Sequence, residues 1–226
     1  MIKKLPILMC RDNKLTKTSC WLILIFAALF IPKTFDVRDV VQATTYSSLD
    51  IDSDILCEGD IIFRRGISLI SNMVLEADAS SPYSHVGIII FDSLQPFVVH
   101  AVPDESESGI DYIKKDSLNQ FLRKDRASAY AVYRHYDRTA SRLAAKISEG
   151  YYKKKILFDS AFDLFDSKEL YCTELVWKAY KEVNVDITNN VFDTLTIPLG
   201  KNPYLLPGTL LRSSRLTKIT NVSFYQ

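Results

Sequence analysis

The sequence predicts a domain of mixed strands and helices that follows an N-terminal segment of different character. Three observations support this prediction. Two apolar runs, 85–91 and 97–102, enclose a short polar connection, which is typical of a β-hairpin. Apolar residues recur at helical spacing over 138–153. A further helical pattern over 171–183 begins close to Cys172 and has apolar positions suited to a core.

Length and composition are those of a globular protein. The chain has 226 residues, of which 47% are hydrophobic and 24% are charged, enough for one domain with a substantial core. Residues 1–43 hold seven Lys and Arg against three Asp and Glu, which leaves 21 basic and 24 acidic residues in 44–226. A slightly acidic domain lacks the basic surface that nucleic acid requires, so we expect no nucleic-acid partner.

The N-terminal segment has the pattern of an export signal. Five basic residues between Lys3 and Lys17 precede twelve uninterrupted apolar residues, 20–31. Twelve helical residues span about 18 Å, whereas the hydrocarbon core of a membrane is roughly 30 Å thick. We therefore expect residues 1–43 to be a signal peptide or an N-terminal membrane anchor, and 44–226 to be the functional domain. The domain would then be periplasmic or extracellular and would contact a membrane only through this segment.

Within the domain, the predicted elements follow one another without an internal repeat. Apolar residues at helical spacing distinguish the expected helices from the expected strands. The expected order is a strand at 59–64, a helix at 66–77, the hairpin at 85–102, a short helix near 118–122, a strand at 129–134, and helices at 138–153 and 171–183.

The hairpin permits a geometric prediction about two of the three histidines. If its turn has two residues, so that Phe91 pairs with Pro96, alternation places His85 and His100 on the same face of the sheet. The two residues are then diagonal neighbours, roughly 7–8 Å apart at the backbone and within side-chain reach. A turn with one residue more or fewer would place them on opposite faces.

Cys172 is the candidate nucleophile. A helix N-terminus and a nearby imidazolium lower the pKa of a thiol from its usual value of about 8.5. A thiolate attacks a carbonyl carbon when a base takes the proton and a third group orients the base. His85 and His100 can supply that base and that orienting group. Three other interpretations remain open at this point: a core cysteine, core histidines, and a zinc site of Cys172 and both histidines, for which no fourth ligand is evident.

Four separated motifs occur in a characteristic order: Gly59-Asp60-Ile61-Ile62-Phe63, Ser81-Pro82-Tyr83-Ser84-His85-Val86-Gly87-Ile88, Val99-His100-Ala101-Val102 and Tyr171-Cys172-Thr173-Glu174-Leu175-Val176-Trp177. They resemble the YiiX/YaeF group of permuted NlpC-type papain-like cysteine hydrolases over about residues 55 to 216. The resemblance implies an α+β, circularly permuted papain-like fold whose antiparallel β-sheet packs against the nucleophile helix. It implies Cys172 as nucleophile and His85 as general base. We expect Tyr83 and Asp159 to bind substrate, and the proposed chemistry requires neither a metal nor another cofactor.

Two positions depart from the pattern of that family. His100 stands where this group usually has Glu, and Phe158 precedes Asp159 where relatives often have Tyr. We expect a thiol amidase or peptidase that cleaves a small peptide or acylated substrate, such as a cell-wall peptide or a lipid, through an acyl-enzyme. The alternatives are a lipid acyl-ester hydrolase or acyltransferase, which an apolar pocket near Cys172 would favour, and an inactive binding module. His135 lies beside charged residues and is expected to be exposed to solvent.

Overall fold

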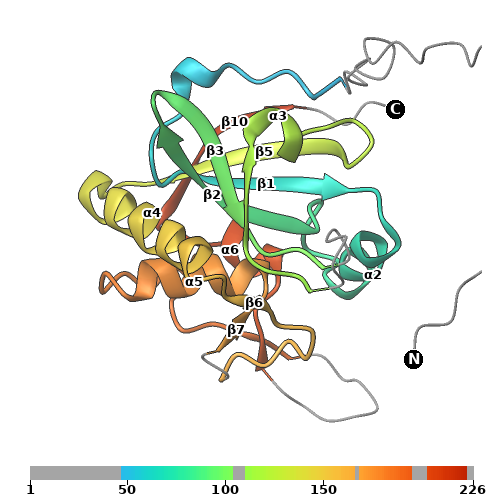
Figure 1. The fold of residues 1–226 in the computed structure, drawn as a ribbon. Helices are drawn as coiled ribbons and strands as arrows, with labels where there is room; N and C mark the ends of the chain where they lie inside the picture. Colours follow the sequence, from blue (N-terminus) through green and yellow to red (C-terminus); the bar gives the residue numbers. More distant parts are fainter. Residues whose placement is uncertain (1–46, 104–109, 166–167, 195–202, 223–226) are drawn as a thin grey trace, which may run out of the picture. The chain divides into compact units, whose positions relative to one another are not determined.

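The computed structural model describes residues 47–103, 110–165, 168–194 and 203–222. At its centre is a six-stranded antiparallel sheet of order β10-β5-β1-β2-β3-β4 (Figure 1). Its strands are β1 (Ile61–Gly66), β2 (His85–Asp92), β3 (Gln95–His100), β4 (Lys114–Ser117), β5 (Ala127–His135) and β10 (Leu216–Val222).

The predicted export segment, 1–43, lies outside the described residues, so the signal peptide or anchor stays a prediction. Within the part of the chain that the structure describes, no helix is both long enough and apolar enough to cross a membrane.

Helices cover both faces of the sheet. On one face, α4 (Arg138–Lys153) and α5 (Cys172–Lys181) pack against alternate residues of the central strands, among them Phe63, Val86 and Ile88. The other face packs against α3 (Leu118–Phe121) and the segment 49–56, through residues such as Ile62, Ile89 and Val98. The predicted α+β architecture, with an antiparallel sheet packed against the helix that begins at Cys172, is confirmed.

The hairpin of β2 and β3 has the predicted register. Phe91 pairs with Pro96, and the turn consists of Ser93 and Leu94. Both turn residues have positive φ, 50° and 69°, as a two-residue type I′ turn requires. The turn therefore places His85 and His100 on one face of the sheet, the face that α3 covers.

Helix α5 begins with a buried acidic cap. Glu174 accepts a hydrogen bond from the Tyr171 N–H at 3.2 Å and forms an ion pair with Lys178 at 2.6 Å. Burial, against the opposing effect of Lys178, raises the pKa of Glu174 to about 7. An acidic residue in the first turn and lysines in the last turn both complement the helix dipole.

The described residues also form several smaller elements. They are η2 (Ser53–Ile55), α2 (Leu69–Ala77), β6 (Leu157–Phe158), β7 (Glu169–Leu170), β8 (Asp193–Thr194), β9 (Pro203–Tyr204) and α6 (Pro207–Leu211). Strand β6 pairs in parallel with β7, which leads directly into α5. Helix α2 is capped by Ser68 and contains no buried residue, although its sequence is largely apolar.

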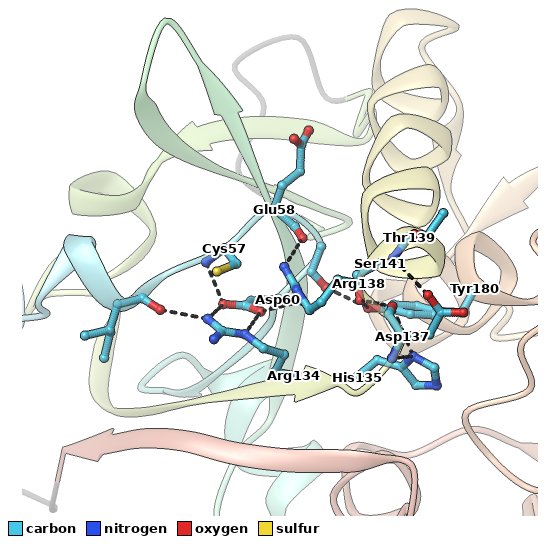
Figure 2. Close-up of polar contacts among 12 residues, drawn as sticks. Cys57, Glu58, Asp60, Arg134, His135, Asp137, Arg138, Thr139, Ser141 and Tyr180 are labelled. Carbon is cyan, nitrogen blue, oxygen red and sulfur yellow. Dashed lines mark hydrogen bonds and ion pairs between the residues drawn. The ribbon is translucent and has the colours of Figure 1, made fainter.

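A polar network joins β1 to β5 and α4 (Figure 2). The fully buried carboxylate of Asp60 accepts hydrogen bonds from Nε and Nη2 of Arg134, both at 2.7 Å. Arg138 Nη1 lies 3.4 Å from the same carboxylate. Tyr180 of α5 donates to the carbonyl of Gly59 at 2.7 Å. The network thus fixes the beginning of β1 against both helices of that face.

The expectation that His135 is exposed was wrong, because its ring is buried. It packs against the rings of Tyr136 and Tyr180, with centroids 4.3 Å and 5.7 Å away. The charged neighbours that suggested a solvated position are engaged elsewhere, since Arg134 binds Asp60 and Asp137 caps α4.

Candidate active site

The hairpin brings two imidazoles into direct contact. His85 Nε2 lies 2.9 Å from His100 Nδ1, and the two rings are nearly perpendicular. Gly87 is required for this approach of β3. A Cβ at Gly87 would lie 3.0 Å from His100 Cβ and only 2.8 Å from the carbonyl oxygen of Val99. The predicted proximity of His85 and His100 is therefore present.

The hydrogen-bonded chain continues to Asp116 of β4. His100 Nε2 lies 3.2 Å from Asp116 Oδ2. Burial opposes ionisation of Asp116, but the hydrogen bond from His100 and nearby cations together lower its pKa. Sequence analysis missed this residue, because β4 reads Lys-Lys-Asp-Ser and has no apolar alternation.

The carboxylate determines which ring nitrogens carry protons. An ionised Asp116 can only accept, so Nε2 of His100 must donate to it. In neutral His100, Nδ1 is then the acceptor, and Nε2 of His85 donates to it. Neutral His85 consequently presents an unprotonated Nδ1. The chain from Asp116 to His85 thus prepares one nitrogen as a base.

Arg64 and Phe121 enclose the histidine pair. The Phe121 ring lies 5.7 Å from the ring of His85 and 5.1 Å from that of His100. Arg64 is the cross-strand partner of His85, and its guanidinium lies 4.6 Å over the Phe121 ring. Burial, together with the positive charge of Arg64, lowers the pKa of His85 well below its ordinary value of 6.5. His85 is therefore neutral at pH 7.

The thiol of Cys172 lies at the beginning of β2. Backbone N–H groups of Val86 and Thr173 face the sulfur, and Val86 directly follows His85 in the chain. In this structure no hydrogen bond joins the described side chains of Cys172 and His85. Such contacts are often long in unliganded active sites and shorten when substrate binds.

The resting thiol is protonated, contrary to the expected lowering of its pKa. Burial raises the pKa of Cys172 to about 11, although backbone N–H groups and Arg64 act in the opposite direction. The site therefore holds a neutral thiol beside a neutral imidazole. An arrangement of this kind forms the thiolate as it attacks, with proton transfer to the base.

An apolar cavity of about 800 Å³ lies between α2, the segment 157–162 and the strand β7. Neither Cys172 nor His85 lines the cavity, but two residues of its wall are close to Cys172 and to His100 in the chain. Glu169 lines the cavity three residues before Cys172, and Pro103 lines it three residues after His100. Three residues span at most about 10 Å, so the cavity lies close to the proposed reacting groups.

The two predicted substrate-binding residues have structural contacts. Tyr83 is buried, and its hydroxyl donates to the carbonyl of Tyr130 at 3.4 Å. Asp159 is also buried and accepts hydrogen bonds from the backbone N–H groups of 161, 162 and 163. Neither side chain lines the cavity. Asp159 instead shapes the loop that places Phe158 and Phe162 in the cavity wall.

The fold and the site can be compared with those of known proteins. A family model described as a permuted papain-like amidase enzyme of the YaeF/YiiX, C92 family matches residues 56–220. Among solved structures, the chain is similar to that of the metalloprotein yiiX from Escherichia coli O157:H7, with 21% identity and a TM-score of 0.60. This similarity covers 73% of the chain and 97% of yiiX. A comparison with curated protein sequences finds no match.

The described residues do not fit a metal centre. No group of three or more His, Cys, Asp or Glu side chains among them could hold a metal ion. His85 and His100 point their nitrogens at each other, not at a common point. We therefore derive no step through a metal.

Proposed function

Because the chain belongs to the C92 family of permuted papain-like amidases, we propose that it hydrolyses an amide bond with Cys172 as the nucleophile and His85 as the general base. The observation that carries this proposal is the hydrogen-bonded chain from His85 through His100 to Asp116, next to a helix that begins at a cysteine.

The proposed reaction has two stages. The sulfur of Cys172 forms a bond to the carbonyl carbon while Nδ1 of His85 takes the thiol proton, and the carbonyl π electrons move to oxygen. The carbon–nitrogen bond then breaks, and the departing amine receives the proton from His85. Water, deprotonated by His85, next attacks the carbonyl carbon of the thioester. The carbon–sulfur bond then breaks, the acid is released, and the proton on His85 returns to the sulfur of Cys172. The backbone N–H of Cys172 at the α5 N-terminus stabilises the oxyanion in both stages.

Asp116 supplies a carboxylate behind His100, the residue that stands where this family usually has Glu. During the reaction His85 becomes an imidazolium, which a neutral His100 stabilises less well than a carboxylate would. The carboxylate of Asp116 lies one hydrogen bond further along the same chain. The arrangement thus retains an acidic residue that can compensate the positive charge, with His100 as the link.

Acylation of Cys172 can be tested with a reactive acyl donor. Treatment with p-nitrophenyl acetate, acid quenching and peptide mass spectrometry should locate an acetyl group on Cys172 in the wild type and in Cys57→Ala. Cys57 is a suitable control because it is also a free, half-buried cysteine. His85→Ala should slow acylation by about 10²–10⁴-fold, the usual contribution of a general base. Equal acylation of Cys57, or no effect of His85→Ala, would contradict the proposed function.

A further inference from the structure

A second cavity, of about 390 Å³, lies beside the last turns of helix α5. Its volume is within the roughly 300–1,000 Å³ of small-molecule sites, which hold a ligand by apolar contact and orient it with a few polar groups. The described wall combines apolar side chains with two ammonium groups, and it includes Leu164, Phe165, Trp177, Phe192, Lys178 and Lys181. The two lysines are therefore the groups that can orient a ligand in this cavity.

The apolar part of the wall favours an aromatic ligand. The rings of Trp177 and Phe192 meet edge to face, with centroids 5.3 Å apart. Trp177 is held in place, because its Nε1 donates to Oδ1 of Asp186 at 3.3 Å. Phe165 also lines the cavity, although 80% of its surface is exposed. A flat ring placed among these side chains would cover apolar surface that water now contacts and would meet aromatic partners.

The two lysines give the cavity a positive charge. Nζ of Lys181 lies 4.2 Å over the ring of Trp177, so this ammonium group stands at the aromatic wall. Nζ of Lys178 lies 2.6 Å from Oε1 of the buried Glu174. The described wall contains no carboxylate, and the nearby Asp186 uses both oxygens in hydrogen bonds to neighbouring residues. The charge of the cavity is thus complementary to an anion.

We propose that this cavity binds an aromatic carboxylate, with its ring against Phe165 and Phe192 and its carboxylate at Lys181 and Lys178. The cavity shares no described lining residue with the one near Cys172, so it is a separate site. The inference does not depend on the proposed amide hydrolysis.

Occupancy of this site should be linked to protonation of Glu174, because ionised Glu174 competes with the ligand for Lys178. Burial and the negative charge of Asp159 raise the pKa of Glu174 to about 7, against the opposing effect of Lys178. The phenols of Tyr151 and Tyr171 also lie near Glu174, but burial raises their pKa values further above this range. A proton on Glu174 releases Lys178 for the ligand. The ligand should therefore bind more tightly at about pH 6 than at about pH 8.

Isothermal titration calorimetry of the full chain with 2-naphthoate tests the inference, with 2-naphthamide as the uncharged analogue. The acid should bind with a Kd below about 1 mM, and the amide about tenfold more weakly, because it forms no charge-assisted contact. Lys181→Met should raise the Kd of the acid about tenfold for the same reason. Lys153→Met is the matched control and should leave this Kd unchanged, since Lys153 is an exposed lysine in the last turn of another helix, α4.

Two further variants decide where the acid binds and whether Glu174 is linked to it. Val74→Trp obstructs the cavity near Cys172 and should leave binding intact. Loss of binding in Val74→Trp, or equal affinity for acid and amide, would overturn the inference. In the wild type the Kd should rise about threefold between about pH 6 and pH 8, whereas Glu174→Gln should show no such change. The same rise in Glu174→Gln would contradict the link to Glu174. All of these measurements can be made whether or not Cys172 is acylated.

Discussion

In the proposed reaction, the charge state of a single imidazole controls the chemistry of the site. His85 can take the thiol proton only while it is neutral, and its cross-strand partner Arg64 helps to keep it so. A histidine whose pKa is lowered in the folded protein remains neutral at pH values where the unfolded chain is protonated. Its contribution to stability is therefore present above pH 6.5 and is lost as pH falls below that value.

Replacing Arg64 by Met should raise the pKa of His85, because the nearby positive charge is lost while the apolar stem remains. The acid limb of kcat/KM, which reports the base of the free enzyme, should move to higher pH. Arg65→Met is the control, since the guanidinium of Arg65 donates to the carbonyl of Pro82 at 3.1 Å. The position of this acid limb is measured in both variants from the pH dependence of Cys172 acylation. Identical acid limbs in the two would show that Arg64 does not influence His85.

Among the elements, those with a strong apolar pattern were the ones that could be predicted from sequence. The register of β2 and β3 followed from two apolar runs around an even connection, and the pairing of Phe91 with Pro96 confirms it. Strand β4 could not be predicted, because it is a polar strand at the sheet edge, and Asp116 was missed with it. The cavity was also beyond prediction, because its wall joins residues from Ile70 to Leu206 that meet only in the folded chain.

In the first turn of helix α5, Glu174 contributes to the stability of the protein in a way that depends on pH. Burial raises the pKa of Glu174 from 4.5 to about 7, so the folded protein retains a proton there that the unfolded chain has lost. The contribution of Glu174 to stability is thus greatest below pH 4.5 and falls as pH rises to about 7. Glu174→Gln keeps an acceptor for the Tyr171 N–H but cannot ionise. Urea unfolding should show the stability of this variant, relative to wild type, rising over that pH range and levelling off above it.

The control for this measurement is Glu149→Gln in α4. Glu149 also pairs with a lysine four residues later, at 2.9 Å, but on the exposed side of its helix. Exposed pairs of this kind contribute about 0.3–0.5 kcal/mol. A stability difference for Glu174→Gln that is the same at low and high pH would show that the carboxylate ionises normally.

The whole molecule assembles its site from both faces of one sheet. His85 and His100 lie on the face that α3 covers, whereas Cys172 begins a helix on the opposite face. The two halves meet at the beginning of β2, where the N–H of Val86 faces the sulfur of Cys172, so the proposed chemistry needs residues from both faces. The histidine strands also precede the cysteine helix in the chain, which is the permuted order of the family.

The polar network at the beginning of β1 should stabilise this assembly without affecting the chemistry. Asp60→Asn removes a buried charge that faces two arginines (Figure 2). Breaking a buried ion pair costs 3–5 kcal/mol, and partial exposure of both arginines should reduce this to about 3 kcal/mol in urea unfolding. Asp54→Asn in the exposed η2 is the control and should change stability by less than about 0.5 kcal/mol. Asp60 stands at the opposite end of β1 from Arg64. Cys172 in the Asp60→Asn variant should therefore be acylated at the wild-type rate under all conditions in which the variant remains folded. A loss of acylation in the folded variant would show that the network also positions the active site.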